Sequence, residues 1–265
     1  MSTFIIPASA TPTVHALGLA AARRGLDVLP LSLASALTLV PSSGRLHLFG
    51  GPRLAGRVQQ RAPLALLEPE DDWLTTLPEH LVRRRVRLVP ALEAYGLQER
   101  FFVKMPREKG LEPGPYLGHE LPTLPPDEPL LVSDLVTMTD EYRFWILDGA
   151  VHASSSYRID GRPDARALNS RAPSSLHRFV ADLLADQAHQ LPSAVVVDVA
   201  WISQPDTGWA VVEANMAWFS SHYAGDPVRV LDVVLRAAGP PVAVSARDAR
   251  FASVNSDPHE GRAAG

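Results

Sequence analysis

Two short apolar segments near the C-terminal end, each interrupted by an acidic residue, limit the fold of this chain more than any other feature. Residues 194–202 read Ala-Val-Val-Val-Asp-Val-Ala-Trp-Ile, and residues 209–215 read Trp-Ala-Val-Val-Glu-Ala-Asn. The polar segment between them, residues 203–208, contains proline, aspartate and glycine. Apolar runs of this length around such a turn predict a β-hairpin. Any fold that packs this hairpin must also accommodate Asp198 and Glu213 on its strands.

The acidic residues of this hairpin, together with Asn215, form a candidate metal site. Residues two apart on a strand share a face, so Glu213 and Asn215 point the same way, with Asp198 on the neighbouring strand. A single acid at a strand end is more often a turn residue or an ion-pair partner. Two uncompensated carboxylates on packed strands are costly, however. Two carboxylates and an amide oxygen suit Mg²⁺, with phosphates and water completing the coordination.

The bulk composition is that of a globular protein without a strong charge preference. The chain has 265 residues, of which 46% are hydrophobic and 20% charged, and its net charge is −4. This length allows one large domain or two to three small ones. The absence of a basic field argues against nucleic acid as a main partner. The chain has no cysteine, which excludes disulfides and thiolate metal sites.

Neither a signal peptide nor a membrane segment is expected. Residues 8–10 read Ala-Ser-Ala, but no basic segment precedes them and the apolar run is short. The longest apolar stretch, residues 28–40, is interrupted by polar residues and is too short to span a bilayer. We therefore expect a soluble cytoplasmic protein with no membrane partner.

The first 90 residues predict a small α/β domain. Residues 4–6 resemble a strand, and Thr11 followed by Pro12 is typical of a helix start. This helix is expected to run to Arg24, before a second strand at 27–31. A β-α-β start indicates parallel strands. Since no Gly-x-Gly-x-x-Gly follows the first strand, a Rossmann dinucleotide site is not expected there.

The middle of the chain predicts a strand that carries Lys104, and then a lid. Residues 99–104 form the strand, and residues 105–129 form a Pro- and Gly-rich loop that we expect to be mobile or lid-like. A further strand is predicted at 130–136. Upstream, Arg83, Arg84, Arg85 and Arg87 form a basic cluster. We interpret it as a solvated helix end, with an anionic-ligand or interface patch as the alternative.

A second hairpin is predicted around Asp148-Gly149, between strands 141–148 and 150–154. Alternation places Glu141, Arg143 and Trp145 on one face of its first strand. The remaining expected elements are helices at 174–190 and 228–238 and a flexible tail at 241–265.

The order of these motifs resembles that of the ATP-grasp family of ATP-dependent ligases. The segments that carry the resemblance are Phe101–Lys104, Leu131–Leu135, Glu141–Phe144, Val197–Val199 and Val212–Asn215. The resemblance covers roughly residues 90–240. It implies an α/β (α+β) fold, with a small N-terminal α/β domain (1–90) and an ATP-grasp domain (91–240). In the latter, two α+β subdomains would clasp the nucleotide, with the lid subdomain at about 97–136.

The resemblance also implies roles for individual residues. Lys104 would bind the α- and β-phosphates of ATP, and Lys109 the outer phosphates. The hinge against adenine would be Ser133, Asp134 and Leu135, and either Asp134 or Glu141 would hold the ribose hydroxyls. Mg²⁺ would be held by Asp198, Glu213 and Asn215. Arg143 would neutralise the transferring phosphoryl group, and Arg158 would bind a substrate carboxylate or acyl phosphate.

Several of these cations also have ordinary structural interpretations. Lys109 lies in a charged surface loop, Arg158 suits an exposed position, and Arg143 could pair with Glu141 on its own strand. His222 and Tyr223, shortly after Asn215, are candidates to face the substrate.

The chain departs from the family at three places. Its lid lacks a dense Gly/Ser run, and Val196 stands where some relatives have arginine. Residues 216–221, Met-Ala-Trp-Phe-Ser-Ser, replace the Pro-Gly that often follows the asparagine. The last difference indicates an altered acceptor pocket.

The expected function is an ATP- and Mg²⁺-dependent ligase that joins a carboxylate to an amine through an acyl phosphate. Its partners would be a small-molecule or peptide carboxylate and an amine acceptor, and a homodimer is compatible with the sequence. The alternatives are a catalytically silent nucleotide-binding or regulatory module, and a phosphotransferase on the same fold. No feature of the sequence identifies the acid or the amine.

Overall fold

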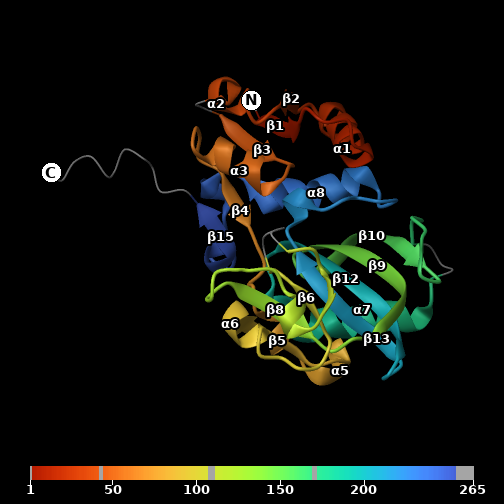
Figure 1. The fold of residues 1–265 in the computed structure, drawn as a ribbon. Coiled ribbons are helices and arrows are strands. Elements are labelled where there is room, and N and C mark those ends of the chain that lie inside the picture. The colour runs from red at the N-terminus through yellow and green to blue at the C-terminus, as the bar shows by residue number, and fades with distance from the viewer. Residues whose placement is uncertain (1, 42–43, 107–110, 169–171, 255–265) are drawn as a thin grey trace.

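The computed structural model describes residues 2–41, 44–106, 111–168 and 172–254. Four β-sheets make up the framework of this part of the chain. In Figure 1 the N-terminal elements lie at the top, the larger sheets lie below, and helix α8 runs between them. The mixed α/β architecture agrees with the fold class expected from the sequence.

The N-terminal domain is built on a parallel sheet with strand order β2-β1-β3. Thr11 caps the first helix, since its hydroxyl accepts from the Val14 N–H at 3.2 Å. Gly25 ends the segment with φ of 79°, which glycine adopts at low cost. The β-α-β prediction is therefore confirmed. The elements are β1 (Ser2–Pro7), α1 (Pro12–Arg23), β2 (Asp27–Leu31), α2 (Ala36–Leu39), β3 (Arg45–Leu48) and α3 (Pro52–Gln59).

The C-terminal segment returns to this domain instead of forming a flexible tail from residue 241. Strands β14 and β15 pair with the two edges of β4. The Asp248 carboxylate accepts from the Ser193 N–H and hydroxyl, both at 2.7 Å. The tail prediction is therefore wrong for residues 241–254, and residues 255–265 lie outside the described residues. The elements are β4 (Ala65–Leu67), α8 (Pro227–Ala237), β14 (Ala238–Gly239), η4 (Pro241–Ala243), η5 (Ala249–Phe251) and β15 (Ala252–Val254).

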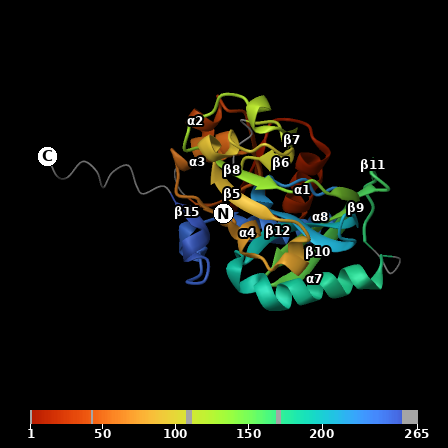
Figure 2. The ribbon, with the colours of Figure 1, turned by 60° about the horizontal axis from the view of Figure 1, so that its bottom comes forward.

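A five-stranded antiparallel sheet, β11-β10-β9-β12-β13, forms the centre of the molecule. Both predicted hairpins are present in it, the first turning at Asp148 and Gly149 with φ of 50° and 80°. Helix α7 runs along one face of the sheet, as Figure 2 shows. The elements are β9 (Thr137–Leu147), β10 (Ala150–Ile159), β11 (Arg162–Pro163), α7 (Ser174–Gln187), η2 (Ala188–Gln190), β12 (Ala194–Gln204), β13 (Gly208–Asn215) and η3 (Ala217–Phe219).

The two faces of the central sheet bury different cores. Phe144 and Val197 pack with α7 on one face, whereas Trp145 and Val196 pack toward α8 and the N-terminal domain on the other. This alternation is the two-residue period of a strand. It places Arg143 on the face directed toward the N-terminal domain, together with Trp145, as predicted.

The lid subdomain is a four-stranded antiparallel sheet, β5-β8-β6-β7. Because β5 pairs with β8, this sheet begins before residue 91, where we expected the domain boundary. The expected loop at 105–129 also contains a strand, β7, which pairs with β6. The elements are α4 (Trp73–Thr76), α5 (Glu79–Val82), β5 (Val86–Pro90), α6 (Ala91–Ala94), β6 (Phe101–Lys104), β7 (Gly114–Tyr116), η1 (Gly118–Glu120) and β8 (Pro129–Ser133).

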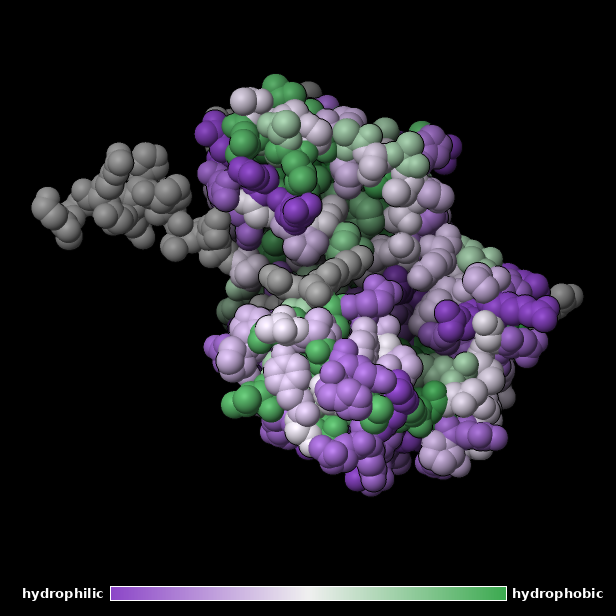
Figure 3. Space-filling model, in the orientation of Figure 1, coloured by the Kyte–Doolittle hydropathy of each residue, from purple (hydrophilic) through white to green (hydrophobic). Residues whose placement is uncertain are grey.

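The surface is polar over much of the lower part in Figure 3, and hydrophobic residues are more evident over the N-terminal domain. Leu33 and Leu39 in that domain are 44% and 58% exposed. Among the described residues, no helix combines the length and hydrophobicity needed to cross a bilayer.

Candidate functional site

The hairpin β12–β13 brings Asp198, Glu213 and Asn215 to one place. Asp198 lies directly opposite Glu213, but the next residue, Val199, lies opposite Val211. One extra residue in β13 therefore forms a β-bulge beside the acid pair. Val211 packs into the core with α7, so unbroken alternation would bury Glu213 there as well. The bulge instead turns Glu213 and Asn215 to the face shared with Asp198.

Arg143 holds Asp198 from the other neighbouring strand. The two residues are register partners between β9 and β12. The arginine donates from Nε to Asp198 Oδ1 at 2.8 Å and from Nη2 to Oδ2 at 2.7 Å. Its Nη1 donates to the Ser221 carbonyl at 3.3 Å. Both charged groups of the pair are buried, at 10% and 2% side-chain exposure. A bidentate, charge-assisted pair of this kind fixes the orientation of both partners.

The ionisation of the two buried partners follows from this geometry. Burial disfavours the charge of Arg143, but the adjacent Asp198 carboxylate outweighs that effect and raises the arginine pKa. Burial raises the pKa of Asp198 to about 6, and Arg143 opposes that shift. Asp198 therefore remains mainly ionised at neutral pH.

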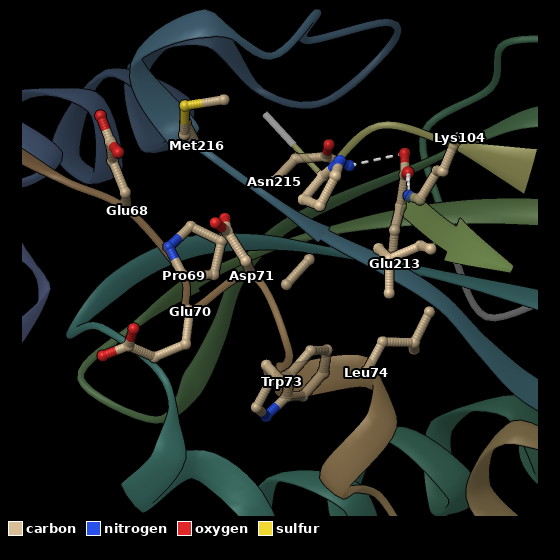
Figure 4. Close-up of a pocket in the computed structure, with 13 residues that line it drawn as sticks. Glu68, Pro69, Glu70, Asp71, Trp73, Leu74, Lys104, Glu213, Asn215 and Met216 are labelled. Atoms are coloured by element: carbon tan, nitrogen blue, oxygen red, sulfur yellow. Dashed lines mark hydrogen bonds and ion pairs between the residues drawn. The ribbon is translucent and has the colours of Figure 1, made fainter. Parts of the chain in front are cut away.

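Glu213 forms an ion pair with Lys104 of β6. The Asn215 amide Nδ2 donates to Glu213 Oε1 at 2.8 Å and to Asp198 Oδ2 at 3.2 Å. Figure 4 shows the Lys104 and Asn215 side chains directed at the Glu213 carboxylate. Burial alone would raise the pKa of Glu213, but Lys104 and the Asn215 amide outweigh it and lower the pKa to about 2. Glu213 is therefore a fixed negative charge at neutral pH.

A cavity of about 640 Å³ lies between the lid sheet and the central sheet. Its volume is within the range of small-molecule sites. The segment from Ser133 to Met138 borders one part of it, and Lys104 and Glu213 border another. The lining residues are Leu74, Arg84, Val86, Phe102, Lys104, Pro113, Leu131, Ser133, Asp134, Leu135, Val136, Thr137, Met138, Glu141, Tyr157, Arg158, Val212 and Glu213.

The other acids along this cavity also contact cations. Asp134 accepts from the Arg85 backbone N–H at 3.0 Å and forms an ion pair with its guanidinium. Glu141 accepts from the Tyr157 hydroxyl at 2.8 Å and lies 3.2 Å from Arg158 Nε. The predicted alternative, in which Arg143 pairs with Glu141, is wrong.

A second, smaller pocket adjoins the cavity at Lys104 and Glu213, and Figure 4 shows its residues. Asn215 and Met216 line one part of this pocket. The segment Glu68–Asp71, which follows β4, lies across from them. The pocket therefore joins the Glu213–Asn215 end of the cavity to an acidic segment from the N-terminal part of the chain.

A sequence model described as an ATP-grasp domain, the second family of its clade, matches residues 81–233, which is more than half of the chain. The chain belongs to this ATP-grasp family. The matched residues include both strands of the acidic hairpin, the lid sheet and most of α8. The resemblance expected from the motifs is therefore confirmed.

Solved structures of ATP-grasp proteins share this fold. A D-alanine–D-alanine ligase from Bacillus anthracis matches with a TM-score of 0.54 at 11% identity, covering 89% of this chain and 97% of that one. D-cycloserine synthetase DcsG matches with 0.54 at 14%, covering 88% and 97%. A RimK domain ATP-grasp protein from Sphaerobacter thermophilus matches with 0.53 at 13%, covering 88% and 99%. The comparison with curated proteins gives no match.

Most residues predicted for the ATP-grasp site lie around the two pockets. Those that line the large cavity are Lys104, Ser133, Asp134, Leu135, Glu141, Arg158 and Glu213. Asn215 lines the adjoining pocket, while Arg143 and Asp198 form the buried pair behind Glu213. Lys109 lies outside the described residues.

Other residues of the site carried weaker signals in the sequence. Arg84 lines the cavity, although we interpreted its basic cluster as solvated. Tyr157 was not predicted. It stacks on Tyr223 with ring centroids 5.1 Å apart, and Arg143 lies 5.8 Å from its ring centroid. His222, considered as a substrate contact, instead lies 3.0 Å from the Thr13 hydroxyl in the N-terminal domain. Cross-strand neighbours of this kind depend on register, which the sequence does not display.

The donor set of the ATP-grasp site suits a hard divalent cation in part. Within the described part of the chain, no group of three or more His, Cys, Asp or Glu side chains is arranged to hold a metal ion. Glu213 and Asn215 nevertheless place a carboxylate and an amide together beside the cavity, which are oxygen ligands that Mg²⁺ accepts. Both oxygens of Asp198 accept from Arg143, so Asp198 could join them only after that contact changes.

Proposed function

We propose that this ATP-grasp protein is an ATP- and Mg²⁺-dependent ligase that joins a carboxylate to an amine through an acyl phosphate. The observation that supports it best is the cavity between the lid sheet and the central sheet. It offers a backbone segment, Ser133–Leu135, at one part and the Lys104–Glu213–Asn215 cluster at another. A nucleotide has the same two requirements, a base that needs a flat apolar slot and phosphates that need cations.

The nucleotide would lie with adenine against the hinge and its phosphates toward Lys104. The apolar side chains Val86, Phe102 and Met138 line the cavity and would contact the base. Asp134 or Glu141 would accept hydrogen bonds from the ribose hydroxyls. Lys104, whose ammonium pairs with Glu213 here, would turn to the α- and β-phosphates.

Glu213 and Asn215 would hold Mg²⁺, with Asp198 as a further ligand if Arg143 releases it. When bound, the ion would supply positive charge to the phosphate oxygens. Arg143 already satisfies Asp198, so we assign it to holding that carboxylate in place. Arg158 has a side chain 47% exposed and lines the cavity, and it is the better candidate to contact the transferring phosphoryl group.

In the proposed reaction, a carboxylate oxygen of the acid attacks the γ-phosphorus of ATP, and ADP leaves. The amine nitrogen then attacks the acyl carbon, the phosphate leaves, and the nitrogen loses a proton. The products are an amide, ADP and phosphate. Positioning and charge neutralisation account for most of the catalysis of such phosphoryl transfers.

The test is ADP release from ATP and Mg²⁺ across panels of amino acids, small carboxylic acids, peptides and amines. Release that requires both an acid and an amine, with an amide found by mass spectrometry, supports the proposal. Glu213→Ala should abolish it, while Asp127→Ala, at an exposed loop position, should leave it unchanged. Full turnover by Glu213→Ala would contradict the assigned site. Nucleotide binding without ADP formation would favour a silent binding module, and a stable phosphorylated product would indicate a phosphotransferase.

A further inference from the structure

Arg84 differs from the other cations of the large cavity in having no carboxylate partner. Lys104 pairs with Glu213, and Arg158 pairs with Glu141. Within the described residues, Arg84 forms no ion pair, although it is 8% exposed and lines the same cavity.

The hydrogen bonds of Arg84 go to main-chain carbonyls. Its Nη1 donates to Val82 O at 2.8 Å and to Val211 O at 2.9 Å, and its Nη2 donates to Val212 O at 3.1 Å. These contacts fix the guanidinium against β13 but leave its charge unneutralised. In the described part of the chain, its Nε has no hydrogen-bond partner.

The carboxylates closest in influence to Arg84 are already paired with other cations. Burial lowers the pKa of Arg84 to about 10, and Glu213 and Asp134 oppose that shift from a distance. Glu213 binds Lys104, and Asp134 binds Arg85. Arg84 is therefore protonated at neutral pH. A buried charge without a counter-charge is costly unless a ligand supplies one.

The position of Arg84 indicates which part of a ligand it would meet. It contacts the carbonyls of Val211 and Val212, immediately before Glu213 along β13. The hinge residue Asp134 influences it from the other direction. Arg84 therefore lies between the end of the cavity assigned to the outer phosphates and the end assigned to the base.

We propose that Arg84 is a binding residue for the phosphate nearest the ribose, and that it neutralises this phosphate with its preoriented guanidinium. The inference rests on the proposed nucleotide site and adds a contact that discriminates nucleotides from nucleosides. Arginine suits this task because its planar fork remains charged when buried and matches phosphate oxygens. The three carbonyl contacts hold the fork in place before the ligand arrives.

The test compares the dissociation constants of adenosine and AMP by calorimetry, without metal, for the wild type, Arg84→Met and Arg85→Met. Arg85 is the matched control, because its side chain is 76% exposed and pairs with Asp134. The wild type and Arg85→Met should bind AMP more tightly than adenosine. Arg84→Met should weaken AMP binding about tenfold or more while adenosine binding stays unchanged.

A purely structural role for Arg84 predicts a different result, in which adenosine and AMP binding weaken equally. That outcome, or an unchanged AMP-to-adenosine ratio, would overturn the inference. If Arg84→Met does not fold, Arg84→Gln keeps an amide donor for the carbonyls and removes the charge, so the same ratio decides. Failure of the wild type to bind any adenine nucleotide would instead contradict the proposed function itself.

Discussion

Arg143 of β9 and Asp198 of β12 lie directly opposite each other in adjacent antiparallel strands, and the guanidinium donates to both carboxylate oxygens. The pair stands beneath Glu213 and Asn215, and Asn215 also donates to Asp198. A structural ion pair and the candidate metal ligands therefore share one carboxylate. Changes to the pair should affect stability first and the site second.

Replacing Asp198 by asparagine should destabilise the protein by about 3 kcal/mol, because it leaves a buried arginine without a counter-charge. The measurement is urea unfolding followed by circular dichroism at pH 7. Arg143→Met with Asp198→Asn should cost less than the sum of the two single changes, since the double variant buries neither charge. Strictly additive free energies would show that the two side chains do not interact.

Glu213 should make the stability depend on pH in acid. Its pKa is lowered to about 2 from the ordinary 4.5 in the folded state, so its ionised form stabilises the fold above pH 4.5. That contribution is lost as the pH falls from 4.5 toward 2. We expect the difference in unfolding free energy between the wild type and Glu213→Gln to shrink over this window. Urea unfolding at pH 7, 4.5 and 3 measures it, and a constant difference would contradict the assigned ion pair with Lys104.

Asp248 should be required to hold the C-terminal segment. It is 1% exposed and accepts from the Ser193 N–H and hydroxyl and from the Ser245 hydroxyl at 2.8 Å. Asp248→Ala leaves these buried donors without an acceptor and should cost about 2 kcal/mol or more. Protease digestion should then cut the segment after Ala243 sooner. Unchanged stability and protection would mean that the pairing of β15 with β4 alone holds the segment.

Asp226 should stabilise helix α8 from its N-terminus. Its Oδ1 accepts from the N–H groups of Val228 at 2.8 Å and Arg229 at 3.4 Å. Asp226→Ala should lower the unfolding free energy by about 1 kcal/mol, as expected for loss of an N-cap. Thermal unfolding of this variant beside Asp127→Ala, an exposed loop change, provides the comparison. Equal melting temperatures would exclude a capping contribution.

Local signals in the sequence predicted the secondary structure around the site well. Thr11-Pro12 marks the first helix, and Asp148-Gly149 marks a hairpin, because each fixes a backbone conformation through neighbours in sequence. The apolar strands of the acidic hairpin were equally clear. These features depend on a few consecutive residues, so they are visible without the tertiary structure.

Features that depend on distant partners could not be predicted in the same way. The bulge beside Glu213 arises from the pairing of β12 with β13, and simple alternation would place Glu213 on the same face as Val211. The partner of Arg143 depends on the register of β9 against β12, so Glu141 was an equally reasonable choice. The segment after residue 240 resembled a tail because its anchors, Ser193 and β4, lie far away in the sequence.

The pairing of β4 with β14 and β15 also constrains the order of folding during synthesis. Helix α8 packs against α1 and β3, and both new partners of β4 follow it in the chain. The ribosome therefore releases the first domain long before the elements that cover it. Until α8 emerges, the apolar residues that it will bury remain accessible to chaperones and to other nascent chains.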